Sequence, residues 1–217
     1  MDPREVYARL LESFGRQNWW PIDREYHLRR GTNPLDEVVI GAVLTQNASW
    51  KNAEKALERL KEKGELSLRF VKEVSLERLK ELVRPAGFYN QKAVYLKEVA
   101  SFLLSPRGVL PRREELLKVK GVGRETADAI LLYAYGVPTF VVDKYTLRWL
   151  ERFYGLRTDY EGAKAFFERS VAKNAPVYSE YHALLVELGK RHCRARRPVC
   201  GDCPLRDACL LYNSFKK

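Results

Sequence analysis

The 217-residue chain contains little sulfur and no long apolar run. It has one Met and four Cys, and all the cysteines lie in the last 25 residues. No apolar stretch reaches the roughly 20 residues that a membrane-spanning helix needs. The start, Met-Asp-Pro-Arg-Glu-Val-Tyr, lacks the basic and apolar segments of a signal peptide. The sequence also contains no internal repeat and no low-complexity tract. It therefore predicts a soluble, cytoplasmic, globular protein.

Basic residues are in clear excess. The chain has 39 Lys and Arg against 28 Asp and Glu, a net charge of +11. Such a surplus attracts polyanions and favours nucleic acid or an acidic membrane surface as partner. Thermophilic proteins are often rich in charged residues of both signs, and the single Met also fits a thermophilic source. Charge alone therefore leaves nucleic-acid binding as one of several explanations.

The spacing of apolar residues predicts an all-α protein. Asp2-Pro3 and Asn33-Pro34 are helix start signals, and Thr158 with Glu161 predicts a capping box. The segment 137–142 is β-branched but contains a proline and has no partner strand, so we expect a linker. Apolar residues recur at helical spacing in five stretches, 34–44, 53–60, 93–103, 127–134 and 181–188.

Two loops mark domain boundaries, at Arg30–Asn33 and at Gly136–Thr139. We therefore expect a central helical domain over residues 32–138. The segments 1–31 and 139–217 are expected to pack together as a second helical domain.

The cysteines have the spacing C-x6-C-x2-C-x5-C. Four thiolates this close in sequence can hold one metal centre. Zinc sites usually combine two C-x2-4-C pairs, and only Cys200 and Cys203 form one here. The compact loop suits a [4Fe-4S] cluster, which also takes four thiolates, whereas disulfides do not fit an intracellular protein. The spacing favours an iron–sulfur cluster over zinc at Cys193, Cys200, Cys203 and Cys209.

Gly121-Val122-Gly123 lets the chain turn tightly between a helix ending near Lys118 and another beginning near Arg124. Backbone N–H groups at such a turn, beside a helix N-terminus, bind an anion without sequence preference. In a chain of this charge the turn predicts a contact with a nucleic-acid phosphate, with an ordinary packed connection as the alternative. Asp143, about five helical turns further on, is either a reactive carboxylate, a helix N-cap, or both.

Lys120–Ala127 together with Asp143 resembles the helix-hairpin-helix and aspartate signature of the endonuclease III superfamily of DNA glycosylases. Gly136-Val137-Pro138 fits the Gly/Pro loop of that superfamily, and Cys193–Cys209 resembles its iron–sulfur loop. The match covers roughly residues 30–210. It implies a two-domain helix-hairpin-helix fold, a [4Fe-4S] cluster, and a monomeric base-excision-repair enzyme acting on double-stranded DNA with a damaged base.

The resemblance also implies which residues contact DNA. Gln46 resembles the residue that fills the gap left in the duplex, and Gly87–Ala93 resembles a second wedge loop with Phe88 and Asn90 as contacts. The hairpin residues implied to bind DNA are Lys120, Gly121, Val122, Gly123, Arg124 and Thr126.

Glu125 departs from the bifunctional members, which have a lysine at this position. That amine forms a Schiff base with the sugar and leads to strand cleavage, whereas a glutamate cannot form an imine. The resemblance therefore implies an enzyme that removes a base and has weak or no lyase activity. Lys144, next to Asp143, is an amine that would substitute poorly for this lysine. Glu125 itself is a candidate catalytic residue or an idle carboxylate at a helix N-terminus.

Trp19-Trp20-Pro21 and the segment 125–131 resemble one subgroup, the 3-methyladenine/7-methylguanine glycosylases. A cationic alkylated purine would stack on the indoles of Trp19, Trp20 and Trp50, which otherwise are core residues. Asp143 would stabilise the oxocarbenium-like sugar or activate water. Lys190 matches a pocket lysine of the subgroup, or is an exposed lysine at a helix end.

Several other functions stay open at this point. The best-known members of the subgroup lack the cysteine loop, so the resemblance implies a prokaryotic branch that kept it. An oxidised-pyrimidine glycosylase/lyase and a uracil or thymine mismatch glycosylase are the alternatives. An adenine-mismatch enzyme would have a glutamate within 38–44, and Glu37 lies just before it. A non-enzymatic DNA-binding module is the remote alternative.

Overall fold

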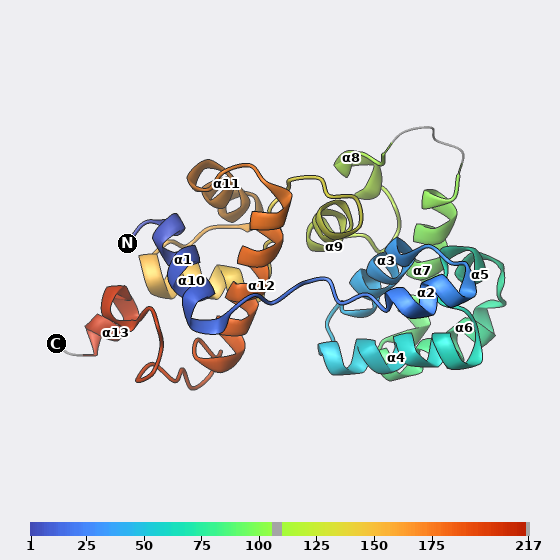
Figure 1. The fold of residues 1–217 in the computed structure, drawn as a ribbon, viewed down its shortest axis with the longest axis horizontal. Coiled ribbons are helices and arrows are strands. Elements are labelled where there is room, and N and C mark those ends of the chain that lie inside the picture. Colours follow the sequence, from blue (N-terminus) through green and yellow to red (C-terminus); the bar gives the residue numbers. More distant parts are fainter. Residues whose placement is uncertain (106–109, 216–217) are drawn as a thin grey trace. The chain divides into compact units, whose positions relative to one another are not determined.

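The computed structural model describes residues 1–105 and 110–215 (Figure 1). All regular structure in the described residues is helical, as predicted, and 137–142 forms no strand. None of the described helices combines the length and the apolar character needed to cross a bilayer. The chain divides into two compact units, one made of Met1–Trp19 and Gly136–Lys217 and the other of Trp20–Tyr135.

The unit Trp20–Tyr135 is built around α3 (Pro34–Leu44), whose residues from Asp36 to Leu44 are all buried. A helical stretch that is apolar on every side, as Val38–Leu44 is, has to lie inside a domain, and α3 packs against α4, α7, α9 and η2 (Figure 1). The other elements are α2 (Arg24–Arg30), α4 (Trp50–Lys63), α5 (Leu68–Glu73), α6 (Leu76–Val83), the 3-10 helix η1 (Arg84–Ala86), α7 (Tyr89–Leu103), α8 (Arg113–Leu116), α9 (Arg124–Ala129) and the π-helix η2 (Ile130–Ala134).

The other unit centres on α12 (Ala175–Arg191), which packs against α1 (Pro3–Phe14) and α10 (Lys144–Tyr154). Its core is aromatic, with the rings of Phe140 and Phe167 stacked at 4.1 Å. Tyr181, on α12, meets both rings edge-on. The remaining elements are α11 (Tyr160–Ser170), the 3-10 helix η3 (Arg206–Ala208) and α13 (Leu210–Ser214).

Helix starts follow the predicted signals with one exception. The Asp2 carboxylate accepts hydrogen bonds from the N–H groups of Arg4 and Glu5 and forms a capping box. Asn33 caps α3 through the N–H of Leu35. The predicted cap at Thr158 is wrong, because α11 starts one residue later and is capped by Asp159.

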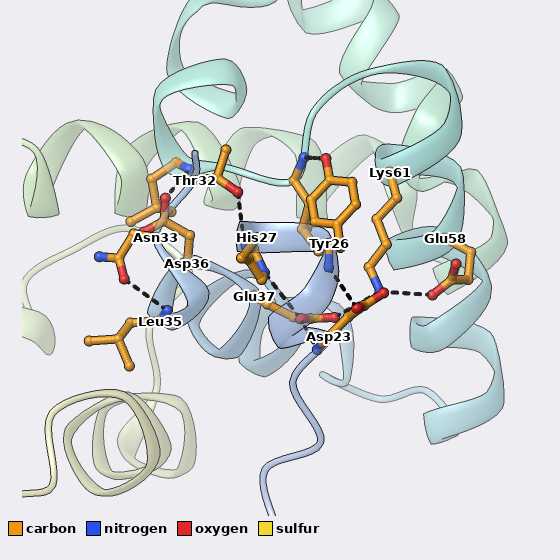
Figure 2. Close-up of polar contacts among 12 residues, drawn as sticks. Asp23, Tyr26, His27, Thr32, Asn33, Leu35, Asp36, Glu37, Glu58 and Lys61 are labelled. Atoms are coloured by element: carbon orange, nitrogen blue, oxygen red, sulfur yellow. Dashed lines mark hydrogen bonds and ion pairs between the residues drawn. The ribbon is translucent and has the colours of Figure 1, made fainter. Parts of the chain in front are cut away.

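The structural boundaries differ from the predicted ones, which were 31/32 and 138/139. They fall between Trp19 and Trp20 and between Tyr135 and Gly136. The first shift arises because α2 is anchored to the unit that follows it (Figure 2). The buried ring of His27 lies with Nε2 3.2 Å from Glu37 Oε2, and the Tyr26 hydroxyl accepts the N–H of Leu66. These contacts are tertiary and leave no mark in local sequence.

Candidate functional site

The turn between α8 and α9 requires its glycine at position 121. Gly121 has a φ of 84°, in the left-handed region, and a Cβ there would lie 2.1 Å from Cγ of Tyr95. Gly123 is the N-cap residue of α9, and no side chain caps this helix. Lys120 and Arg124 flank the turn and are both exposed, while Val122 is buried. The turn therefore presents backbone and basic side chains and anchors itself through Val122.

Arg113 joins the two helices of this hairpin. Its Nε donates to Asp128 Oδ1 at 2.8 Å and its Nη2 to Oδ2 at 3.0 Å. Asp128 is fully buried, so this bidentate pair fixes α8 against α9. The pair was not predicted, although an aspartate inside the apolar stretch 127–134 is a signal of a buried partner.

The structure brings Gln46 to the hairpin. Gln46 Nε2 donates to the Gly121 carbonyl at 2.8 Å and to the Thr126 hydroxyl at 2.9 Å. Thr126 is buried at 6% exposure, so its hydroxyl contacts Gln46 inside the protein. The turn after α3 and the hairpin are thus joined by one side-chain amide.

The predicted second wedge loop is exposed at its tip. Phe88 is 64% exposed and has a φ of 48°, at the N-cap of α7. Left-handed backbone is unusual for an aromatic residue. Asn90 is exposed in the first turn of α7. Phe88 thus presents a large apolar ring to solvent at the start of an α-helix.

Trp20 and Trp50 lie together in the unit Trp20–Tyr135. Their ring centroids are 5.4 Å apart and nearly perpendicular, and Tyr133 approaches Trp20 at 5.3 Å. Trp20 lies against Gly41 of α3, where a Cβ would come within 2.9 Å of the indole. Neither Gly41 nor Tyr133 was predicted to take part. All three rings are half-buried and form an aromatic group with some exposed surface.

Asp143 is the N-cap residue of α10 and is 9% exposed. Its Oδ1 accepts the Thr146 N–H at 2.8 Å and the Thr146 hydroxyl at 2.9 Å. Its Oδ2 lies 3.6 Å from Nε2 of His182 on α12. Burial raises the pKa of Asp143, but His182 and the Thr146 hydrogen bonds outweigh it, so the pKa lies below its usual value. The group is therefore a buried carboxylate kept as an anion.

Trp19 and Lys190 belong to the same surroundings as Asp143. The Trp19 ring meets the His182 ring edge-on at 5.7 Å, and the Ser179 hydroxyl donates to the Trp19 carbonyl. Lys190 Nζ lies 5.7 Å from the Trp19 ring centroid. The sequence did not predict that His182 lies beside Asp143, because a single histidine within an apolar helix does not indicate which residue it contacts. The ammonium group of Lys190 thus lies over the face of the Trp19 ring, which is a cation–π arrangement.

The structure gives three other candidate residues distinct environments. Glu125 is exposed in the first turn of α9, and Lys144 is exposed as the first residue of α10. Glu37 is buried, and its carboxylate accepts the Asp23 N–H at 2.8 Å and lies 3.2 Å from Lys61 Nζ (Figure 2). With His27 also at 3.2 Å, Glu37 is engaged within the protein.

The four cysteines are free thiols that line one cavity. Arg152 Nη1 lies 3.6 Å from Cys193 Sγ and also donates to the Arg194 carbonyl. Arg148 Nε donates to the Cys193 carbonyl at 2.8 Å. The other lining residues include Trp149, Phe153, Leu188, His192 and Leu205. Two arginines of α10 thus fix the start of the loop that carries the thiols.

The donor set of this cavity fits a sulfur-ligated metal centre, with four thiols in a largely apolar wall. Burial raises the pKa of Cys203 to about 11, so this thiol keeps its proton at neutral pH unless a metal replaces it. No three His, Cys, Asp or Glu side chains within 1–105 and 110–215 converge closely enough for a single metal ion.

Known proteins resemble the chain over most of its length. Residues 40–173 match the model of the HhH-GPD superfamily base excision DNA repair protein family. A protein of Methanocaldococcus jannaschii described as a DNA repair glycosylase is 42% identical to this chain. The aligned region covers 95% of this chain and 94% of the length of that protein.

Two solved structures are also similar. A trapped endonuclease III–DNA covalent intermediate has a TM-score of 0.82 at 25% identity. The superposition covers 99% of this chain and 97% of the chain in that structure. The H. pylori 3-methyladenine DNA glycosylase bound to 1,N6-ethenoadenine has a TM-score of 0.68 at 29% identity, covering 88% of this chain and 98% of its own.

Proposed function

We propose that this chain, which belongs to the HhH-GPD superfamily of base excision DNA repair proteins, is a monofunctional DNA glycosylase that excises alkylated purines. The observation that carries the proposal is the environment of Asp143, a buried carboxylate held as an anion by Thr146 and His182. The hairpin has the exposed Glu125 where an attacking amine would stand in a lyase. A glutamate cannot form an imine with the sugar, so base release should not lead to strand cleavage.

The substrate class rests on aromatic rings and on leaving-group chemistry. Alkylation at purine N3 or N7 makes the base cationic, and a cationic ring is attracted to an indole face. Trp20 and Trp50 offer such faces, whereas the ammonium group of Lys190 lies over the Trp19 ring and would have to move aside for a cationic base to stack there. The similarity to the H. pylori 3-methyladenine DNA glycosylase supports the same class.

The proposed reaction needs little acid catalysis. The enzyme flips the nucleotide out of the duplex, which such chemistry requires. The N-glycosidic bond then breaks, and the bonding electron pair neutralises the departing cationic base. The Asp143 anion stabilises the positive charge that develops on the sugar. Water adds at C1′, and Asp143 accepts its proton before releasing it to solvent.

DNA contacts are proposed for the unit Trp20–Tyr135. Backbone N–H groups around Gly121–Gly123, with Lys120 and Arg124, would hold a phosphate at the N-terminus of α9. Such contacts set position and carry no sequence information. Gln46 and Phe88 would fill the space left by the flipped nucleotide, because both lie on turns next to helix ends and Phe88 is exposed.

The four cysteines are proposed to hold one [4Fe-4S] cluster, with zinc as the alternative. When bound, the cluster would supply a structural cross-link among the four thiols and take no part in glycosidic cleavage. Arg152 beside Cys193 suits a centre of net negative charge. Broad absorbance at the blue edge of the visible spectrum would indicate the cluster, and a colourless protein with bound zinc would contradict it.

One assay tests the proposed function. Purified protein is incubated with duplexes that each carry a single lesion: 3-methyladenine analogue, 7-methylguanine, uracil, thymine–guanine mismatch or thymine glycol. We expect strand breaks at alkylated purines only after alkaline workup. Breaks without alkali, with trapping by borohydride, would instead identify an endonuclease III-like glycosylase/lyase. Release of uracil or thymine alone would identify a mismatch glycosylase, and binding without release a non-enzymatic module.

A further inference from the structure

One buried ammonium group connects the turns that carry Gln46 and Phe88. Lys92, on α7, is only 2% exposed. Its Nζ donates to the Leu44 carbonyl at 2.7 Å and to the Ala86 carbonyl at 2.8 Å. Lysine is rarely buried to this degree, because removing an ammonium from water is costly. Burial lowers the pKa of Lys92 to about 8. The position therefore needs a reason beyond core packing.

Both acceptors lie at the ends of helical segments. Leu44 is the last residue of α3 and Ala86 the last residue of η1. Carbonyls at a helix end lack intrahelical partners and carry partial negative charge, so a cation is favourable there. The chain continues from these carbonyls directly into the turns 45–48 and 87–88. One side chain thus contacts the backbone at the start of both turns.

Each turn also contains a non-glycine residue with left-handed backbone. Asn47 has a φ of 50° and Phe88 a φ of 48°. Asparagine adopts this conformation readily, but a bulky residue such as Phe88 keeps it only where the surroundings impose it, and such residues occur preferentially at functional positions. The shared tether at Leu44 and Ala86 is a contact that can impose the conformation on both turns together.

We propose that Lys92 is a positioning residue that couples the Gln46 turn to the Phe88 turn, so that both side chains enter a damaged duplex as one unit. The inference rests on the proposed function, because it concerns how the proposed glycosylase fills the space that the flipped nucleotide leaves in the duplex. Gln46 is in addition hydrogen bonded to Gly121 and Thr126. The coupled unit is therefore attached to the hairpin that is proposed to hold the phosphate.

The chain offers a matched control on the same helix. Lys97, also on α7, donates to the carbonyls of Val71 at 3.2 Å and Lys72 at 2.9 Å, and to that of Val74. These carbonyls lie at the end of α5 (Leu68–Glu73), and none of them belongs to a residue proposed to contact DNA. Like Lys92, Lys97 therefore donates hydrogen bonds from its ammonium group to carbonyls at a helix end. Unlike Lys92, it does not contact a turn that is proposed to enter DNA.

The test compares Lys92→Met with Lys97→Met in the full chain. Fluorescence anisotropy measures binding to a duplex with a tetrahydrofuran abasic analogue and to the undamaged duplex of the same sequence. We expect Lys92→Met to lose about tenfold in its preference for the abasic duplex, the size of a lost hydrogen bond to a charged group. Its affinity for undamaged DNA should stay near that of the wild type. Lys97→Met should keep the full preference, and thermal melting checks that both variants are folded.

A second measurement leaves Lys92 in place, in case its replacement unfolds the protein. Gln46→Ala, Phe88→Ala and the double variant are compared with the wild type in the same binding assay. Coupled turns predict that the double variant loses little more preference than either single variant. If the losses of preference in the two single variants add up in the double variant, the inference is overturned. It is also overturned if folded Lys92→Met keeps the full preference for the abasic duplex. Neither result would affect the proposed function. Equal binding of both duplexes by the wild type would overturn the proposed function, and this inference with it.

Discussion

The Nε2 atom of His182 lies 3.6 Å from Oδ2 of Asp143, although the two residues are 39 positions apart in the chain. His182 is buried at 6% exposure and also meets the Trp19 ring. One histidine thereby contacts both the proposed catalytic carboxylate and a proposed base-stacking residue. The first two predictions concern this pair.

Asp143→Asn should reduce base release by at least about 100-fold while leaving DNA affinity nearly unchanged. The amide removes the negative charge that stabilises the developing sugar cation, and preorganised charges of this kind are worth about 100- to 1,000-fold in rate. Single-turnover kinetics on a 7-methylguanine duplex measure the rate. Asn also serves as an N-cap, so α10 should stay folded. Base release at the wild-type rate would remove Asp143 from the mechanism.

His182→Gln should move the acid limb of the pH–rate profile to higher pH. His182 helps to keep the pKa of Asp143 below its usual value, so its loss raises that pKa. The carboxylate must be ionised to act, and it would then protonate at a higher pH than in the wild type. His27→Gln is the matched control, since His27 is an equally buried histidine beside Glu37 in the other unit. An acid limb that shifts equally in both variants would contradict the prediction.

Gly121→Ala should weaken binding to damaged and undamaged duplexes by the same factor. The new Cβ would lie 2.1 Å from the Tyr95 ring, and the backbone is left-handed, so the turn must distort. Phosphate contacts carry no base information, which makes the loss independent of sequence. Gly31→Ala controls for backbone strain, because Gly31 has a φ of 65° and a Cβ added there would have no atom within 4 Å. A loss confined to damaged DNA would argue against a phosphate contact.

Glu125→Lys should allow borohydride trapping that the wild type lacks. The change places an amine in the first turn of α9, where a Schiff base with the sugar could form. Denaturing electrophoresis of labelled duplex reveals the covalent complex. Glu114→Lys, another exposed position on the hairpin helices, should give no trapped complex. Trapping by the wild type would show that Lys144 or another amine already serves.

Local patterns in the sequence predicted the features that local interactions determine. The caps at Asp2 and Asn33, the turn at Gly121 and the absence of a strand at 137–142 each depend on a few neighbouring residues. The predicted start of α11 was wrong because Thr158 and Asp159 are both good caps and the sequence alone does not rank adjacent ones.

Contacts between distant residues escaped prediction. Nothing near Lys92 in the sequence indicates that its ammonium joins Leu44 to Ala86. For Asp128 the sequence signals a buried partner but does not identify it as Arg113, and nothing in the sequence places His182 beside Asp143. The motif therefore indicates candidate site residues, whose roles stay predictions, while the groups that position them are visible only after packing.

The cap at the start of α10 links activity to the integrity of one helical turn. The same Oδ1 of Asp143 that closes this turn through Thr146 belongs to the carboxylate proposed to act on the sugar. If the first turn of α10 frays, the carboxylate loses its orientation while the rest of the unit stays folded. Local opening requires less free energy than global unfolding. Heating should therefore inactivate the enzyme reversibly several degrees before the protein melts, so that loss of turnover reports local fraying rather than denaturation.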